Sequence, residues 1–368
     1  MKYKLLILCL LLLVSGGCAE DSRELDHRSM IIGLSIDKGK EKDFLLTVQV
    51  PILAQGVGSD QAVSKQEFET FSAEADTIWE ALIDIETLTP SVLFFGHLKS
   101  VAISETVAKE DMDKVLNFFD RETTVANQIY MVIIEDEAAE EFIKKDSPLV
   151  SLPALYLNRY FGADQKVSRT NDIKLFEFLR DSNMISNAAS IPLARTKGDQ
   201  MDIDGVAFFQ NYKLQEKVYG LDVAVSQMLH SNKVTDVNIV LEVEHEGKPI
   251  SVALSRGVFK MKFDYDKTTP VEIKLKITGE GEIIDVASMQ EVTSNEFIEK
   301  VEKAVAEDFK QRIYKLTSNM QEANIEPWLV GHRIWALSPE YFGTLNWLEE
   351  GWKAAKFHIS SEFTVTNT

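Results

Sequence analysis

Cysteine is almost absent from this 368-residue chain. The sequence has only Cys9 and Cys18, and both lie within the first eighteen residues. Residues 19–368 therefore cannot form a disulfide, a thiolate metal site or a cysteine nucleophile. Any role of Cys18 has to be one that a cysteine performs without a partner thiol.

Long hydrophobic runs are equally scarce. Leu5–Val14 is the exception, an apolar run that follows Lys2 and Lys4 and is shorter than the ~20 residues needed to span a bilayer. A basic start, a short apolar run and small residues after it are typical of an export signal. We therefore expect residues 1–17 to be a signal peptide. No later segment is long and apolar enough to suggest a membrane span.

Ser15, Gly16 and Gly17 directly precede Cys18. This arrangement resembles the bacterial lipobox, whose cysteine is lipidated and becomes the mature N-terminus, although Ser15 stands where the lipobox usually has leucine. A free thiol, or a cysteine that merely belongs to the apolar run, stays open from the residues alone. We predict lipid attachment at Cys18 and a tether over residues 18–28, which reaches at most about 35 Å.

Basic residues are too few to balance the acidic ones. Without Lys2 and Lys4, 37 of the 39 basic side chains remain against 58 acidic ones, a formal charge of −21. Such a chain is repelled by nucleic acid and by anionic lipid, and we expect no nucleic-acid partner. Membrane attachment would then depend on acyl chains. A diacylglyceryl group at Cys18 supplies the two hydrophobic signals that stable anchoring needs.

The first half of the chain alternates strand and helix patterns. β-rich runs predict strands over 29–37, 44–52, 67–72, 93–104 and 127–134, of which the first two form an antiparallel hairpin. Apolar residues at helical spacing predict helices over 75–87, 109–119, 136–145 and 172–181. The mixture indicates an α+β class, with an N-terminal domain over 29–107 and a middle domain over 108–200.

The remaining residues, 201–368, predict a sheet under a helix. Apolar and polar residues alternate over 237–244, 259–266, 271–278 and 357–365, which is typical of strands with one buried face. Residues 294–322 place seven apolar side chains on one helical stripe, with Ser294 as the N-cap. We expect a multi-domain α+β chain whose C-terminal domain is an antiparallel sheet covered by a long amphipathic helix, about 40 Å in length.

Motifs that carry enzyme chemistry are missing. The six histidines share no metal-ligand spacing, and no GxSxG sequence occurs. Gly56 and Gly58 lack the third glycine and the context of a nucleotide loop. Ser35 and Lys38 form an S-x-x-K string at the end of a predicted strand, where their side chains face opposite sides. We therefore expect neither an enzyme nor a bound cofactor.

Tryptophan is concentrated near the C-terminus. Four of the five tryptophans, Trp328, Trp335, Trp347 and Trp352, lie within twenty-five residues. Such a group either packs at the edge of a core or forms a surface that binds a partner, since tryptophan is enriched at interface hot spots. The sequence leaves both interpretations open.

Several separate stretches together resemble one family. They are DSREL at 21–25, GLSIDKG at 33–39, FGHLK at 95–99, DGVAFF at 204–209, Lys213-Leu214 and Trp347. In this order they resemble the Ger(x)C lipoproteins, the C subunits of nutrient germinant receptors in endospore-forming bacteria. Ala19 departs from the aromatic residue that commonly follows the cysteine, and Ser35 replaces the second glycine of the family's Gly-x-Gly-x-Asp.

The resemblance implies a three-domain α+β lipoprotein on the outer leaflet of the cell or spore inner membrane. It would act with two integral-membrane subunits that convert the binding of amino acids, sugars or nucleosides into release of stored ions and dipicolinate. The family is not known as catalytic, so the resemblance implies an accessory or interaction role. An extracytoplasmic solute-binding lipoprotein of a transport system, or a secreted hydrolase, are the competing interpretations.

Overall fold

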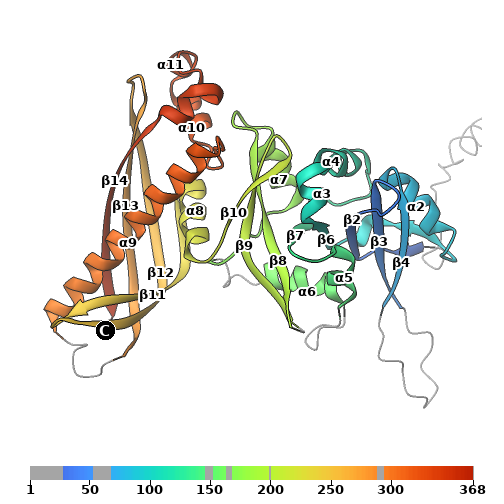
Figure 1. The fold of residues 1–368 in the computed structure, drawn as a ribbon, viewed down its shortest axis with the longest axis horizontal. Coiled ribbons are helices and arrows are strands. Elements are labelled where there is room, and N and C mark those ends of the chain that lie inside the picture. The colour runs from blue at the N-terminus through green and yellow to red at the C-terminus, as the bar shows by residue number, and fades with distance from the viewer. Residues whose placement is uncertain are drawn as a thin grey trace, which may run out of the picture.

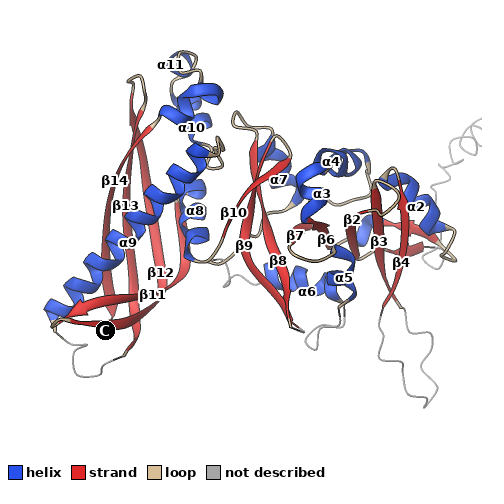
Figure 2. Cartoon of the chain, viewed as in Figure 1, coloured by secondary structure: helices blue, strands red, loops and turns tan. Residues whose placement is uncertain are grey.

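The computed structural model describes residues 28–52, 68–145, 152–162, 168–198, 200–287 and 294–367. Two α+β bodies lie side by side in the described chain (Figure 1). We refer to residues 28–218 as the N-terminal module and to residues 221–367 as the C-terminal module. Figure 2 shows that each module combines a sheet with several helices. The α+β class expected from the sequence is confirmed.

An eight-stranded mixed sheet forms the N-terminal module, in the order β10-β9-β8-β7-β6-β2-β3-β4. The pairs β2-β6, β6-β7 and β7-β8 are parallel, and the remaining pairs are antiparallel. The strands are β2 (Gly33–Lys38), β3 (Phe44–Pro51), β4 (Phe68–Ala75), β6 (Ser100–Ser104), β7 (Tyr130–Ile134), β8 (Ala188–Lys197), β9 (Gln200–Gln210) and β10 (Lys213–Val218).

Helices cover both faces of this sheet. One face packs against α2 (Ile78–Glu86), α3 (Glu105–Glu110), α4 (Met112–Arg121) and α7 (Leu175–Ser182), and the other against α5 (Ala139–Lys144) and α6 (Pro153–Phe161). All five residues of β6 and of β7 are buried, as expected for parallel strands between two helical layers. The apolar content of these strands therefore reflects burial on both sides.

The sheet is continuous across the domain boundaries expected at 107/108 and 200/201. Strand β6 pairs in register with β7, and the predicted helix between them is the crossover that a parallel pair requires. Strands β9 and β10 pair with β8, so residues 201–218 complete this sheet and do not belong to the C-terminal one. Hydrogen bonds between distant strands determine which sheet residues 201–218 join, and the local sequence pattern does not indicate this.

Two predicted strands are interrupted where the chain changes partner. The run 29–37 divides into β1 (Arg28–Met30) and β2, because Ile31 donates its N–H to Phe94 whereas Ile32 donates to Gln49. The run 93–104 divides into β5 (Val92–Phe94), a 3₁₀ turn at Phe95–His97 and β6. Strands β1 and β5 pair in parallel as a separate two-stranded sheet.

The C-terminal module has four long strands in the order β11-β12-β13-β14. These are β11 (Lys233–His245), β12 (Lys248–Asp266), β13 (Glu272–Val286) and β14 (Lys356–Asn367). The first three are antiparallel as predicted, but β14 runs parallel to β13, which corrects the expectation of a wholly antiparallel sheet. The crossover is α9 (Asn295–Glu322), whose 28 residues span about 42 Å and carry the chain back along the sheet.

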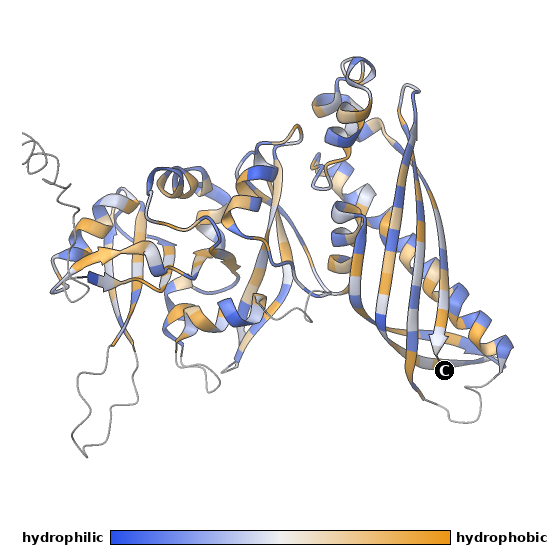
Figure 3. Ribbon diagram, turned by 180° about the vertical axis from the view of Figure 1, so that it is seen from behind, coloured by the Kyte–Doolittle hydropathy of each residue, from blue (hydrophilic) through white to orange (hydrophobic). Residues whose placement is uncertain are grey.

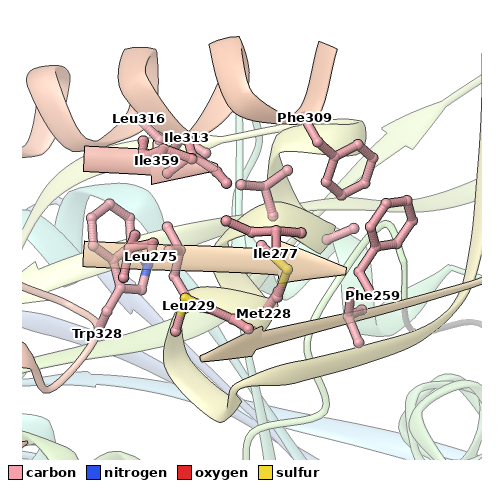
Figure 4. Packing of buried hydrophobic residues seen from close by; sticks show 14 of the residues in the cluster. Met228, Leu229, Phe259, Leu275, Ile277, Phe309, Ile313, Leu316, Trp328 and Ile359 are labelled. Atoms are coloured by element: carbon pink, nitrogen blue, oxygen red, sulfur yellow. The ribbon is translucent and has the colours of Figure 1, made fainter. Parts of the chain in front are cut away.

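The predicted amphipathic stripe of α9 is confirmed. Its seven apolar residues are all buried, and Ser294 accepts a hydrogen bond from the N–H of Phe297 at 3.2 Å. Figure 4 shows this stripe against strand residues and against Met228 and Leu229 of α8 (Leu221–Ser231). The rings of Phe259 and Phe309 stack with their centroids 3.7 Å apart. Figure 3 shows the alternation of hydrophobic and hydrophilic residues along the strands that this packing requires.

The chain between α9 and β14 adds shorter helical segments. They are α10 (Val330–Leu337), α11 (Pro339–Phe342), a π-helical turn at Trp347–Gly351 and α12 (Trp352–Ala354). Trp328 and Trp352 belong to the same core cluster as α9 and the four strands. These segments therefore close one end of the C-terminal core.

Asp37 joins β2 to α5 and makes stability depend on pH. Its carboxylate accepts the N–H groups of Ala139 at 2.7 Å and Glu140 at 2.8 Å. Burial outweighs these bonds and raises the pKa of Asp37 from its ordinary value of 3.8 to about 6. Between pH 3.8 and about 6 the carboxyl of Asp37 is protonated in the folded chain and ionised in the unfolded chain. Its contribution to the free energy of unfolding is therefore complete below pH 3.8 and is lost as pH rises through about 6.

We expect Asp37→Asn to reduce the dependence of the free energy of unfolding on pH between 3.8 and about 6. At about 1.4 kcal/mol per pKa unit, the free energy of unfolding of the wild type should fall by up to about 3 kcal/mol relative to that of the variant between acidic and neutral pH. Urea unfolding of both proteins across that range measures the difference. The exposed Asp84→Asn variant is the control and should keep the wild-type profile. Parallel profiles for Asp37→Asn and the wild type would contradict the prediction.

Candidate functional site

Cys18 and the rest of the tether up to His27 lie outside the described residues. The described chain begins at Arg28, in β1, whose partner strand is β5. Within the described ranges, no helix has both the length and the apolar character needed to cross a bilayer. The attachment expected at Cys18 therefore stays a prediction.

The residues considered for chemistry are separated or already paired. Ser35 is fully buried within β2, whereas the ammonium of Lys38 contacts the carboxylate of Asp111 at 2.6 Å. The described part of the chain contains no group of three or more His, Cys, Asp and Glu side chains arranged to hold a metal ion. Neither observation assigns a reaction to this chain.

Three of the four clustered tryptophans are buried. Trp328, Trp347 and Trp352 are 1, 3 and 2% exposed and lie in the core of the C-terminal module. Trp335 alone of the four is accessible, at 44%. The core interpretation thus holds for Trp328, Trp347 and Trp352, and the alternative of a partner surface made by all four tryptophans is corrected, because these three side chains fill the space between α9, α10 and the end of the sheet.

The family-like stretches of the N-terminal module have architectural roles. Gly33 lies against α6, where an added Cβ would come within 2.6 Å of the Cβ of Ala154. The backbone of Lys99 donates to Ile32 and accepts from Tyr130, so the FGHLK stretch links three strands. These two stretches therefore support helix packing and strand pairing in the N-terminal module.

Asp204 and Gly205 fix the path of β9. Asp204 accepts two hydrogen bonds from the guanidinium of Arg169, at 2.9 and 2.8 Å, and this partner lowers the pKa of the carboxyl. Gly205 has a φ of +111°, a region that L side chains rarely adopt, and a Cβ there would meet the ring of Tyr219 at 2.7 Å. The DGVAFF stretch therefore holds β9 against the loop before α7.

Glu135 is the buried centre of a charge cluster in the N-terminal module. It lies at the end of β7, is 3% exposed, and accepts hydrogen bonds from Lys217 at 2.7 Å and Tyr219 at 2.6 Å. Desolvation opposes protonation of Lys217, but its bonds to Glu135 and Glu105 prevail and raise the pKa of the ammonium. Lys217 is therefore a paired cation that ties the edge strand β10 to the parallel strands, and not a free base.

Glu326 connects the two modules. It is 3% exposed, and its carboxylate accepts the N–H groups of Trp328 at 3.0 Å, Val330 at 2.9 Å and Gly331 at 3.1 Å, together with the hydroxyl of Ser186. Ser186 lies between α7 and β8 of the N-terminal module. Burial raises the pKa of Glu326 above its ordinary value of 4.5.

Glu326 is not among the residues that the sequence predicted to be functional. The available signal was an acidic residue inside the apolar stretch Ile325-Glu326-Pro327-Trp328. An acid there has to be solvated by the protein itself, because burying an unpartnered carboxylate is costly.

A cavity of about 510 Å³ lies beside this junction. Its walls come from both modules and include Asn171, Ser190 and Phe208 on one side and Ser226, His230 and Trp328 on the other. The side-chain Nδ2 of Asn171 donates to the hydroxyl of Ser190 at 2.9 Å, and the side-chain Oδ1 of Asn171 has no hydrogen-bond partner among the described residues. A polar and apolar lining of this kind is compatible with a small molecule.

Two models of spore germination protein families match this chain. A family model described as "Spore germination protein N-terminal domain" matches residues 21–196, and one described as "Spore germination B3/ GerAC like, C-terminal" matches residues 204–368. The two matches cover nearly the whole chain. The chain belongs to the Ger(x)C family of spore germination proteins. The family expected from the sequence is therefore confirmed.

Two spore germination proteins align with this chain over nearly their full length. Spore germination protein KC of Bacillus subtilis (strain 168) is 22% identical, over 100% of this chain and 96% of the relative. Spore germination protein B3 of the same organism is 23% identical, over 99% and 94%. The crystal structure of the GerBC protein matches with a TM-score of 0.54 at 17% identity, over 91% of this chain and 97% of that one. The fold is thus shared across low identity.

Proposed function

We propose that this Ger(x)C protein is a lipid-anchored subunit of a spore nutrient germinant receptor. Cys18 would carry the lipid and hold the protein at the outer leaflet of the cell or spore inner membrane. Two integral-membrane subunits would be its partners, and its own role would be a non-catalytic one. The observation that supports this most directly is the family match along nearly the whole chain.

The folded chain supports an interaction role in two ways. Its family-like residues are used in helix packing, in holding β9 against the loop before α7 and in strand pairing, as described for Gly33, Asp204 and Lys99. The charged clusters around Glu135 and Glu326 consist of groups that already have partners within the protein. A scaffold of this kind is suited to holding two modules in a fixed relation beside a membrane complex.

The direct test is purification of the tagged chain from detergent-solubilised spore membranes. We expect two integral-membrane proteins to accompany it, and spores that lack the chain to respond more slowly to their nutrient. The same tag on an unrelated lipoprotein of that membrane is the control. A chain that purifies alone, with spores of normal nutrient response, would overturn the proposal.

The junction cavity supports a second candidate, an extracytoplasmic solute-binding lipoprotein. Solute-binding proteins hold ligands between two bodies, and the cavity of about 510 Å³ lies between the two modules. Calorimetry of the purified protein against a metabolite panel separates the candidates. Micromolar binding that disappears in Asn171→Leu would favour solute binding over the receptor role.

A further inference from the structure

Helix α2 has apolar side chains on both of its faces. Ile78, Leu82 and Ile85 are buried in the core of the N-terminal module. On the opposite side Trp79 and Ile83 are 56% and 50% exposed. They are one helical turn apart and therefore adjacent on the surface. A surface helix normally presents polar residues to water, so a second apolar stripe indicates that another surface binds there.

Two further exposed apolar residues lie close to the end of α2. Leu88 is two positions beyond Glu86, the last residue of the helix, and is 57% exposed, and Val92 in β5 is 40% exposed. Strand β5 packs next to α2. We call the side chains of Trp79, Ile83, Leu88 and Val92 the α2 surface. Four large exposed apolar residues thus lie within fourteen positions, whereas the C-terminal module has three over the same length, Trp335, Leu337 and Leu348.

The α2 surface lies where the tether joins the folded protein. Val92 is the register partner of Arg28, the first described residue. Only residues 19–27 separate Arg28 from Cys18, and even fully extended they bridge about 35 Å. A lipid at Cys18 would hold this end of the molecule near the bilayer and give the α2 surface a high effective concentration there. Figure 1 shows α2 at the end of the molecule farthest from the C-terminal module.

The chemistry of the α2 surface fits the bilayer interface. Tryptophan prefers the headgroup region, with its ring beside the acyl chains and its N–H in water, and aliphatic neighbours add buried apolar area. The exposed charged residues on α2 are acidic, namely Glu80, Asp84 and Glu86. They would be repelled by anionic headgroups but not by zwitterionic ones.

We propose that the α2 surface rests on the bilayer, with Trp79 inserted into the interface of zwitterionic lipid. This places the N-terminal module against the membrane and directs the C-terminal module away from it. The inference rests on the proposed function in one respect: a lipid at Cys18 would bring the α2 surface close to the bilayer. In the test below, a chemical link to vesicles replaces that lipid.

The mature chain, Cys18 to Thr368, has a single thiol. Addition of this thiol to a maleimide phospholipid forms a thioether and attaches the chain to phosphatidylcholine vesicles without native lipidation. Brominated phosphatidylcholine then quenches tryptophan emission only where a ring enters the bilayer. We expect quenching in the wild type and in Trp335→Phe, and its loss in Trp79→Phe. These two variants each remove one exposed tryptophan, from opposite modules.

A second pair of variants tests the surface with its reporter intact. Ile83→Glu should abolish the quenching of Trp79, whereas Leu337→Glu, at a residue 69% exposed in α10, should leave it unchanged. Replacing part of the phosphatidylcholine with phosphatidylglycerol should weaken the quenching. Equal emission in brominated and ordinary vesicles, or equal quenching with and without Trp79, would overturn the proposal.

The outcome is separable from that of the proposed function. If Ile83→Glu removes the membrane subunits during purification and bromolipid quenching is absent, the α2 surface binds protein and the bilayer proposal is wrong. If quenching occurs as expected but the natural protein carries no lipid at Cys18, the receptor anchor fails and the α2 surface stands.

Discussion

Replacing Cys18 with alanine should move nearly all of the protein from the membrane fraction to the soluble fraction. At about 0.8 kcal/mol for each buried CH₂, two acyl chains contribute on the order of 10 kcal/mol or more to membrane binding. The α2 surface cannot replace them, because four partly exposed side chains bury far less apolar area. Fractionation followed by immunoblotting measures the change, and spores with this variant should respond slowly to their nutrient.

Cys9→Ala is the matched control for this prediction. Cys9 lies within the apolar run of the expected signal peptide, so its replacement should leave the distribution of the mature protein unchanged. A Cys18→Ala protein that stays fully membrane-bound would show that another part of the chain supplies the attachment.

Replacing Glu326 with alanine should lower the free energy of unfolding by roughly 3 kcal/mol or more at neutral pH. The change leaves the N–H groups of Trp328, Val330 and Gly331 without an acceptor, and each unsatisfied buried donor costs about 1–3 kcal/mol. It also removes the bond to Ser186 that joins the modules. Denaturant unfolding followed by tryptophan emission reports the loss, since Trp328 lies beside the site.

Two further variants define the role of the Glu326 carboxylate. Glu326→Gln keeps one acceptor oxygen and should lose less stability than Glu326→Ala, whereas the exposed Glu340→Ala should change little. Because the pKa of Glu326 is raised, its stabilisation is complete below 4.5 and declines as pH rises through the folded-state value. Glu326→Gln should remove that decline. Equal stability of the Ala, Gln and wild-type proteins at every pH would contradict the assignment.

Periodicity was a good guide wherever one face of an element is buried and the other is solvated. The sequence predicted the apolar stripe of α9, its cap at Ser294 and the alternating strands β11, β12 and β13. In each of these elements the apolar residues lie on the face that contacts the core. Periodicity carries no signal in strands that are buried on both faces; β7 was predicted over 127–134 from its β-rich residues. Strand β8 has no solvated face over most of its length and was not predicted.

Pairing between distant segments could not be read from the sequence. The direction of β14 depends on how α9 returns the chain, and the same alternation fits either direction. The eight-stranded sheet runs through both expected boundaries for the same reason. Trp328, Trp347 and Trp352 are buried because α9 and α10 close over them, although their spacing allowed a surface as well.

The sequence by itself determined the chemical limits of this Ger(x)C protein: no cysteine after Cys18, a strong negative charge, no motif of a known active site, and stretches that resemble the family. These properties depend on which residues are present and in what order. Tertiary structure alone decided which groups meet. It joined Glu326 to Ser186 across 140 positions and placed the α2 surface beside Arg28, because burial and long-range pairing act between residues far apart in the chain.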